Sequence, residues 1–191
     1  MKVIVGITGG TGAGKSEISA FLKEHGAYII DADKISRDIT SAGMPALKEI
    51  DKAFPGVVEE GRLNRRRLGE IVFSDKEKLS LLNAITHKYI RAKTEELIEQ
   101  ADGLIVLDAP LLYEAGEERL CDKVIFVDAP ERMRIERICR RDGLSEEEAR
   151  RRVEARDLTL IRNRADVVIE NDGNMKKTKT EIEQFLKGLN S

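Results

Sequence analysis

The chain has 191 residues, of which 41% are hydrophobic and 36% charged, and its formal net charge is −2. This length and apolar content suffice for one compact domain with a full core. The near-neutral charge gives no reason to expect nucleic acid or an anionic membrane as a partner, and no apolar run approaches the roughly 20 residues of a membrane span. Cys121 and Cys139 form neither a disulfide framework nor a ligand-spaced pair, so we expect reduced thiols in a cytoplasmic protein.

Five short apolar runs, rich in Val and Ile, predict the strands of a parallel sheet covered on both faces. They are Val3–Thr8, Tyr28–Asp31, Leu104–Asp108, Val124–Asp128 and Val167–Glu170. Three of these runs end in an aspartate that is followed by loop signals. Because ligands of open α/β sheets bind beyond the carboxyl ends of the strands, we expect these carboxylates near a shared ligand crevice.

The range Lys15–His25 predicts a helix between the first two strands. It places Ile18, Phe21 and Leu22 on one face, and Gly26 is a typical C-terminal stop. The chain therefore reads as strand, helix, strand over its first 31 residues.

The long stretch Lys34–Gln100 shows no strand candidate and predicts several helices. Breaks are expected at Gly43-Met44-Pro45 and at Pro55-Gly56. Because this stretch is far longer than a simple crossover, we interpret it as a helical insertion. A closing amphipathic helix is predicted over Thr178–Leu189.

The strongest chemical signal is the run Gly9-Gly10-Thr11-Gly12-Ala13-Gly14-Lys15-Ser16, which lies between a predicted strand and a predicted helix. It matches the phosphate-loop pattern G-x-x-x-x-G-K-[ST]. Glycines let successive N–H groups turn toward phosphate oxygens, and the helix presents its positive N-terminus to the same anion. Lys15 would lie near the β- and γ-phosphates, and the Ser16 hydroxyl would contact Mg²⁺. A glycine-rich turn that binds nothing is the alternative, which pattern and context together disfavour.

A second signal is Asp31-Ala32-Asp33, with Arg37 four residues after Asp33. If a helix begins near Asp33, this spacing places Arg37 on the same side one turn later. A kinase needs a carboxylate that orients or deprotonates the attacking hydroxyl, and a neighbouring cation can hold an anionic acceptor. The alternative is an N-cap aspartate beside a surface arginine.

The segment Glu131–Arg164 contains eleven arginines, eight acidic residues and no lysine. Two helices are predicted to meet at Arg141–Ser145, where Ser145 and Glu148 have the spacing of a capping box. Arginines stabilise the moving group in phosphoryl transfer through planar contacts to phosphate. Most of these arginines also fit a solvated helix face with pairs such as Glu147 with Arg151, which leaves one or two for catalysis.

Asp108 ends an apolar strand and has two interpretations. It suits a Walker-B aspartate that holds Mg²⁺ through water, and it equally suits a cap for the following segment. The two histidines, His25 and His87, do not have the spacing of metal ligands.

Taken together, these motifs resemble the bacterial dephospho-CoA kinase family, a P-loop kinase family, over nearly the whole chain. The matching runs after the phosphate loop and Asp31–Asp33 are Leu63–Leu68 with Val72-Phe73, Leu82–His87, Pro110–Glu114, Arg140–Asp142, Arg164–Asp166 and Asn171–Gly173. The resemblance implies an α/β three-layer P-loop kinase fold with a five-stranded parallel sheet. It also implies a nucleotide core at 1–33, 101–135 and 163–191, a helical CoA-binding insertion at 34–100 and a helical lid at 136–162.

The resemblance further implies transfer from ATP, with Mg²⁺, to the ribose 3′-hydroxyl of dephospho-CoA. It implies Asp33 as the catalytic base, with Lys15 and Arg140 as the catalytic cations. Expected ATP contacts are Gly10, Thr11, Gly12, Ala13, Gly14, Lys15, Ser16, Glu17, Arg140 and Asn171. Expected acceptor contacts are Thr8, Asp33, Arg37, Arg66, Asn83, His87, Pro110, Leu111 and Leu112. We expect a monomer with no nucleic-acid or membrane partner.

The chain departs from the usual pattern of the family at a few positions. Glu17 stands where Thr or Ser is usual, and Lys88 where Pro is frequent. Arg156 and Ile161 replace the common Gln and Lys near the end of the expected lid, so Arg162 is expected to take over part of the phosphate contact.

Two other functions remain as alternatives. A nucleoside or nucleotide kinase would share the core, although the Asp-Gly-Phe-Pro-Arg-like segment of adenylate-kinase-like chains is replaced here by Asp108–Leu112. A regulatory GTP-binding switch would usually carry an Asn-Lys-x-Asp motif, which the sequence lacks.

Overall fold

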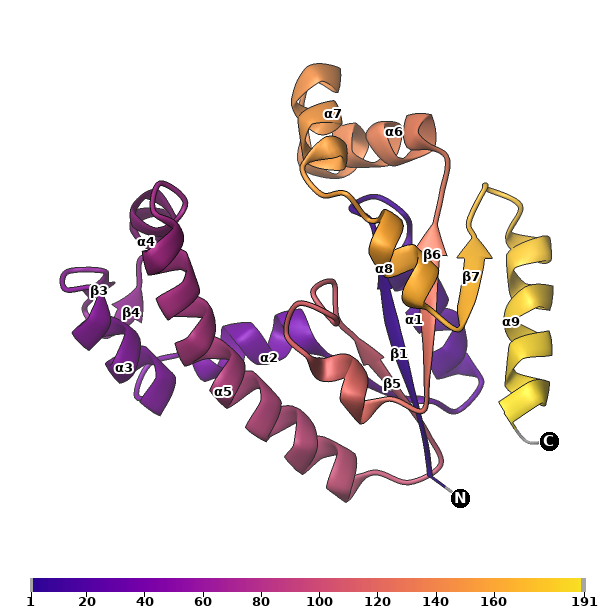
Figure 1. Cartoon of the computed structure of the whole chain (residues 1–191), viewed down its shortest axis with the longest axis horizontal. Coiled ribbons are helices and arrows are strands. Elements are labelled where there is room, and N and C mark those ends of the chain that lie inside the picture. Colours follow the sequence, from indigo (N-terminus) through magenta and orange to yellow (C-terminus); the bar gives the residue numbers. More distant parts are fainter. Residues whose placement is uncertain (1, 190–191) are drawn as a thin grey trace. The chain divides into compact units, whose positions relative to one another are not determined.

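A computed structural model describes residues 2–189 of the chain and shows an α/β architecture (Figure 1). The strands are β1 (Val3–Gly9), β2 (Tyr28–Asp31), β3 (Val58–Glu59), β4 (Arg62–Leu63), β5 (Leu104–Asp108), β6 (Lys123–Asp128) and β7 (Val167–Glu170). The helices are α1 (Lys15–Glu24), α2 (Ala32–Ile39), α3 (Pro45–Ala53), α4 (Arg65–Val72), α5 (Lys76–Gln100), the 3₁₀ helix η1 (Glu117–Leu120), α6 (Glu131–Asp142), α7 (Glu146–Glu154), α8 (Thr159–Arg164) and α9 (Met175–Leu189).

The main sheet has five strands in the order β2-β5-β1-β6-β7. β1 lies at the centre and pairs in parallel with β5 and β6, and β6 pairs in parallel with β7. The predicted parallel sheet and its five strands are therefore confirmed, with β1 one residue longer at its end and β6 one residue longer at its start.

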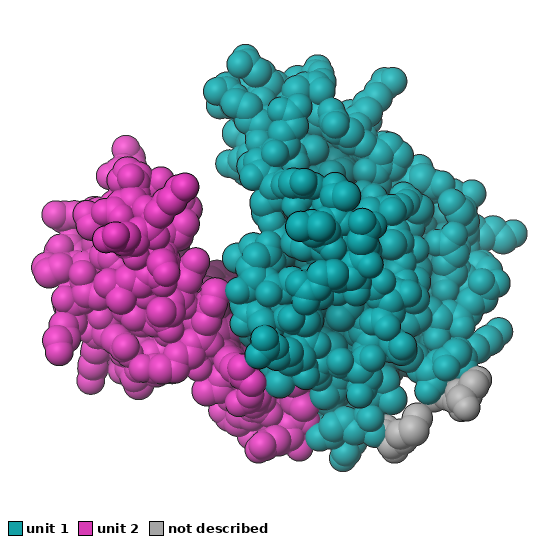
Figure 2. All heavy atoms as spheres, in the orientation of Figure 1, with its two compact units in different colours: residues 1–30, 101–191 teal, residues 31–100 magenta. Residues whose placement is uncertain are grey.

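The chain divides into two compact units (Figure 2). Unit 1 combines Met1–Ile30 with Ala101–Ser191, and unit 2 is the continuous stretch Asp31–Gln100. Within the described range, none of the helices has both the length and the apolar character that crossing a membrane requires.

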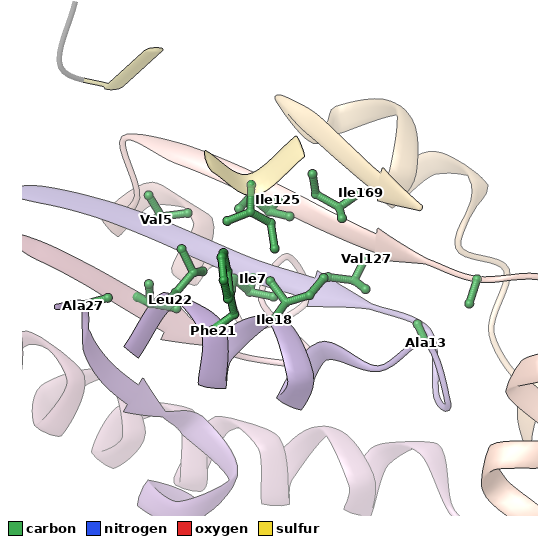
Figure 3. Packing of buried hydrophobic residues seen from close by; sticks show 13 residues of the cluster. Val5, Ile7, Ala13, Ile18, Phe21, Leu22, Ala27, Ile125, Val127 and Ile169 are labelled. Carbon is green, nitrogen blue, oxygen red and sulfur yellow. The ribbon is translucent and has the colours of Figure 1, made fainter. Parts of the chain in front are cut away.

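The core of unit 1 joins the sheet to helices α1 and α9. Ile18, Phe21 and Leu22 of α1 are buried with residues of β1, β5, β6 and β7, as Figure 3 shows. Ile182 of α9 belongs to the same cluster. The predicted inner face of α1 is thus confirmed, and this packing holds the start of α1 rigidly beside the end of β1.

The opposite face of β1 packs closely at Gly6. A side chain there would lie 2.7 Å from Leu112 Cδ2 and 2.9 Å from Cys121 Sγ, so glycine is the residue that fits. Burial raises the pKa of the Cys121 thiol to about 12, which keeps it protonated and unreactive. Neither described cysteine is in a disulfide.

Unit 2 contains α2 to α5 and has its own small core. Six buried residues form this core: Ile50, Phe54, Val57, Leu68, Val72 and Ile85. The expected breaks are confirmed, because α3 begins at Pro45 and ends just before Phe54.

The prediction that unit 2 has no strand is wrong, because β3 and β4 form a short antiparallel hairpin. Its turn residues Glu60 and Gly61 have φ values of 49° and 75°, typical of the type I′ turn that matches strand twist. The strands have two residues each, which is too short for any periodic signal, and Glu-Gly is a weaker turn signal than Asn-Gly.

The meeting of two helices in the arginine-rich segment is confirmed. Gly143 ends α6 in the left-handed conformation, and Ser145 with Glu148 forms the capping box that starts α7. The closing helix, however, begins at Met175 rather than Thr178. The side chain of Asn174 accepts a hydrogen bond from Lys177 N at 3.2 Å, so the capping residue lies four residues before the predicted start at Thr178.

Gly9→Ala should destabilise the chain by about 2 kcal/mol and lower Tm by about 4–8 °C. Gly9 has a φ of 151°, and an added Cβ would lie 2.2 Å from the backbone oxygen of Val127 in β6. The matched control is Gly188→Ala in α9, where the space is open. That change should leave Tm equal or slightly higher, since Ala favours helices. Equal Tm values for both variants in thermal unfolding would contradict the expected close contact.

Candidate active site

The predicted phosphate loop lies between the end of β1 and the start of α1. Gly12 and Gly14 have φ values of 80° and 89°, which favour glycine. Lys15 Nζ reaches back to the Gly9 oxygen at 3.3 Å, so its charge lies across the loop. The loop therefore has the curled backbone and the inward cation that phosphate binding requires.

Two arginines of α6 hold the outer side of this loop. Arg134 Nε donates to the Thr11 oxygen at 3.0 Å, and Arg137 donates to the oxygens of Gly12 and Ala13 at 3.3 and 3.1 Å. Across a trans peptide the carbonyl and the next N–H point in opposite directions. The N–H groups of Gly12 and Gly14 consequently point away from these arginines, which is the orientation an anion inside the loop needs.

The close approach of Arg134 also favours glycine at two positions of the loop. An added Cβ at Gly10 would lie 2.4 Å from the Arg134 guanidinium, and one at Gly12 would lie 2.6 Å from the Arg134 oxygen. Burial lowers the pKa of Arg134, while Asp128 and Glu131 act in the opposite direction, and the group remains charged at neutral pH. The sequence did not single out Arg134; its only signal was the three-residue spacing from Arg137 on one helix.

Asn171, expected at the ATP site, lies directly after β7 and is fully buried. Its Nδ2 donates to the Ala13 oxygen and to Glu17 Oε2, both at 3.0 Å. Among the described residues its Oδ1 has no hydrogen-bond partner. Asn171 thus ties the end of the phosphate loop to the sheet and retains one buried acceptor.

A cavity of about 270 Å³ lies beside the phosphate loop. It is lined by Glu17, Met133, Glu136, Arg137, Arg140, Gly173 and Met175. The structure therefore brings three expected ATP-binding segments together at one cavity: the start of α1, the middle of α6 and the Asn171–Gly173 loop. Thioether and glycine surfaces between cations suit a flat heteroaromatic ring that carries phosphates.

A larger hollow of about 960 Å³ lies along α6 and α7. Its charged lining is largely paired, because Arg150 contacts both Glu131 and Glu146, and Arg132 contacts Glu136. Its lining comes from α6 and α7 alone, whereas the smaller cavity is also lined by Glu17 of α1 and by Gly173.

Arg140 stands apart from the other arginines of its segment. Eight of the eleven contact carboxylates, and Arg134 and Arg137 contact the phosphate loop. Of the eleven arginines in this segment, all within the described residues, Arg140 is the one whose side chain has no hydrogen bond or ion pair, and it lines both hollows. Arg162, by contrast, is bound to Asp128 at 3.1 Å and Glu170 at 3.0 Å, at the ends of β6 and β7.

Oxygen donors for a divalent cation occur at the start of α1 and the end of β5. Ser16 is exposed at the helix start, and one turn later Ser19 Oγ donates to Asp108 Oδ2 at 2.7 Å. No cluster of three or more His, Cys, Asp or Glu ligands exists among residues 2–189. This donor set fits Mg²⁺, which is held mainly by nucleotide phosphates and waters rather than by an all-protein cage.

The loop after β5 carries three of the expected acceptor residues. The Pro110 oxygen accepts a hydrogen bond from Thr8 Oγ1 at 3.2 Å and from Arg156 at 3.1 Å. Leu111 is 47% exposed, whereas Leu112 is fully buried. Leu111 can therefore meet a ligand in this conformation, while Leu112 supports the loop from below.

In unit 2 the expected acceptor residues lie on α2, α4 and α5. Asp31, not Asp33, is the N-cap of α2, because its Oδ1 accepts from Lys34 N at 2.8 Å. Asp33 and Arg37 are exposed one turn apart, as the spacing predicts. The alternative of an N-cap aspartate beside a surface arginine is thus confirmed for Asp31 and Arg37, while the exposed Asp33 carboxylate does not cap the helix.

The other residues in this unit differ in their environments. Arg66 on α4 is 91% exposed and pairs with Glu70 at 3.1 Å. Asn83 and His87 are half-buried one turn apart on α5, which packs against α2. Burial lowers the pKa of His87, so the imidazole is neutral at pH 7 and offers hydrogen bonds rather than charge.

Solved structures of other proteins share this fold. The structure of TT1252 from Thermus thermophilus is similar, with a TM-score of 0.86, 34% identity and 98% of each chain covered. Dephospho-CoA kinase from Campylobacter jejuni has a TM-score of 0.71 and 30% identity over 100% of both chains. Shikimate kinase from Acinetobacter baumannii shares the fold alone, with a TM-score of 0.57 and 17% identity. The fold and the phosphate loop define a P-loop kinase.

The sequence profile of the dephospho-CoA kinase family matches residues 3–177. A dephospho-CoA kinase from Corynebacterium jeikeium is 44% identical, covering 98% of this chain and 100% of the relative. Another from Bacillus licheniformis is 40% identical, covering 97% and 96%. The chain belongs to the dephospho-CoA kinase family. Its activity is the ATP-dependent phosphorylation of dephospho-CoA in coenzyme A biosynthesis.

Proposed function

We propose that this chain transfers the γ-phosphoryl group of ATP to the ribose 3′-hydroxyl of dephospho-CoA, giving ADP and coenzyme A in the last step of that pathway. The observation that carries the proposal is the phosphate loop, whose outer carbonyls are bound by Arg134, Arg137 and Asn171. A loop held in this way is preorganised for a nucleotide triphosphate.

ATP binding is assigned to the phosphate loop and the adjoining cavity. The segment Gly10–Ser16, through N–H groups such as those of Gly12 and Gly14, and the Lys15 ammonium would hold the phosphates, with Glu17 and Arg140 at the cavity wall. Asn171, which is fully buried and not part of the cavity lining, would act on ATP through the phosphate loop, by holding the Ala13 oxygen and Glu17. Ser16 would contact Mg²⁺, which, when bound, neutralises the charge that develops on the phosphates.

Candidate acceptor residues are proposed in each unit separately. Asp33 would accept or orient the proton of the attacking hydroxyl, with Arg37 one turn away for an anionic group. Arg66, Asn83 and His87 of unit 2 would contact the acceptor, and so would Thr8, Pro110 and Leu111 of unit 1, with Leu112 beneath them. The continuous unit 2 supports the assignment of 34–100 as the CoA-binding insertion.

A lid at 136–162 is proposed to close over ATP. Helices α6 and α7 share a small core of Ile135, Ile138, Ala149 and Val153, so they would move as one body. The two ends of this segment are held, by Arg137 on the phosphate loop and by Arg162 on the ends of β6 and β7. Closure would bring Arg140 to the transferring phosphate and exclude water.

Arg140→Ala should lower kcat by about 10- to 100-fold, the equivalent of one charged hydrogen bond, while KM for dephospho-CoA stays nearly constant. The reason is that an arginine acting on the moving phosphoryl group contributes mainly in the transition state. Steady-state kinetics measure both constants. The control is Arg151→Ala on α7. This arginine pairs with exposed Glu147, so its removal should leave kcat and KM unchanged. A rise in KM for dephospho-CoA at constant kcat would instead make Arg140 an acceptor-binding residue.

The whole assignment is tested with labelled ATP and a panel of acceptors. Transfer to dephospho-CoA supports it, and transfer to a nucleoside or nucleotide instead would favour the alternative kinase. Slow hydrolysis without any acceptor would favour a regulatory switch. We further propose that the protein is a cytoplasmic monomer. Light scattering of the purified chain would test whether it is monomeric.

A further inference from the structure

The connection between α7 and α8 is attached to the loop that follows β5. Arg156 lies in this connection and is half-buried. Its guanidinium donates to the Pro110 oxygen at 3.1 Å and forms an ion pair with the Glu114 carboxylate. One planar group thus binds two acceptors four residues apart, which restricts the loop between them more than a single contact would.

A second arginine holds the same segment further along. Arg164, the last residue of α8, donates to Glu118 at 3.2 Å and lies 4.3 Å above the Tyr113 ring. The segment from Pro110 to Glu118 is therefore held by two arginines: Arg156, which precedes α8, and Arg164 at the end of α8. Leu112, within the held stretch, is buried, while its neighbour Leu111 is turned outward.

The held loop is also connected to the start of the phosphate loop. The Pro110 oxygen that accepts from Arg156 accepts from Thr8 as well, and Thr8 directly precedes Gly9. Ala109 N donates to the Ile7 oxygen at 3.0 Å, which fixes the origin of the loop on β1. The conformation of Leu111 consequently depends on contacts from β1 at one end and from Arg156 at the other.

We infer that Arg156 is a positioning residue for the acceptor: it holds Pro110–Glu114 in the conformation that presents Leu111, and thereby sets the affinity for dephospho-CoA. This inference rests on the proposed function of the loop. It assigns to the C-terminal end of the lid segment a role in acceptor binding, separate from the ATP contacts of α6. Arg156 itself need not touch either substrate.

Arg156→Met keeps the length of the side chain and removes both contacts. We expect KM for dephospho-CoA to rise about tenfold, as for the loss of one charged hydrogen bond, with KM for ATP and kcat within about twofold. Arg156→Gln keeps a donor for the Pro110 oxygen and should give a smaller rise. The control is Arg152→Met, whose arginine pairs with Asp142 inside the α6–α7 pair and should leave all constants unchanged.

Glu114→Gln tests the same contact from the other side, in case Arg156→Met does not fold. It should raise KM for dephospho-CoA selectively, and the double variant should be no worse than the more affected single variant, since both remove one interaction. An unchanged KM, or equal rises in the KM values for both substrates, would make Arg156 only a structural tie. If the unaltered chain itself fails to phosphorylate dephospho-CoA, the proposed function fails; if it succeeds and only the selective effect is missing, this inference alone fails.

Discussion

Lys15→Ala should reduce phosphoryl transfer to or below detection while the fold stays intact. Lys15 is the cation of the phosphate loop, and its Nζ lies 3.3 Å from the Gly9 oxygen. Two charged contacts to the β- and γ-phosphates would together account for about 10²- to 10⁴-fold in rate. The measurement is transfer of labelled phosphate to dephospho-CoA at saturating ATP.

The structure indicates why Lys15→Ala should fold. The buried face of α1 consists of Ile18, Ser19, Phe21 and Leu22, which the change does not touch, and Ala is the best helix former. Lys23→Ala on the exposed side of the same helix is the matched control and should be fully active. Near-normal transfer by Lys15→Ala, with an unchanged Tm, would contradict the assignment of this loop as the nucleotide-binding site.

Asp33→Asn should lower kcat by about 10²- to 10⁴-fold, the usual contribution of a general base. The change preserves size and hydrogen bonding but removes the charge that accepts the hydroxyl proton. ATP affinity should change little, because the phosphate loop is built from other residues. Single-turnover kinetics with saturating dephospho-CoA measure the transfer step directly.

Two further variants separate catalysis from stability at this helix start. Asp31→Ala removes the N-cap of α2 and should cost about 1 kcal/mol of folding free energy. Asp38→Asn, on the exposed surface of α2, should change neither kcat nor the folding free energy. If Asp33→Asn retained turnover within about threefold, far less than a general base contributes, another group would have to accept the proton.

The sheet could be predicted from sequence because its strands are continuous apolar runs with clear ends. Helix limits were equally predictable where Gly or Pro marks them, as at Gly26, Pro45 and Gly143. The β3–β4 hairpin was missed because two-residue strands carry no period. The start of α9 was missed because Asn174 caps the helix before its apolar pattern begins.

The candidate site was predictable only where a motif defines it locally. The phosphate-loop pattern identified Lys15 and Ser16 directly, and the spacing placed Asp33 and Arg37 on one side of α2. Composition could not distinguish Arg134, which contacts the Thr11 oxygen, from Arg132, which pairs with Glu136 on the surface. That difference depends on which face of α6 meets the phosphate loop, a property of tertiary packing rather than of sequence pattern.

The order of strands in the sheet has a consequence for synthesis on the ribosome. β1 is made first, but its neighbours are β5 and β6, and Val3 pairs with Leu104. In the sequence, unit 2 comes between β1 and β5 as one continuous stretch with its own core. It can therefore fold while the rest of the chain is still being translated. The phosphate loop reaches its final structure late, because its outer contacts come from α6 and from Asn171, which are synthesised near the end of the chain. We therefore expect nucleotide binding to be among the last properties that the growing chain acquires.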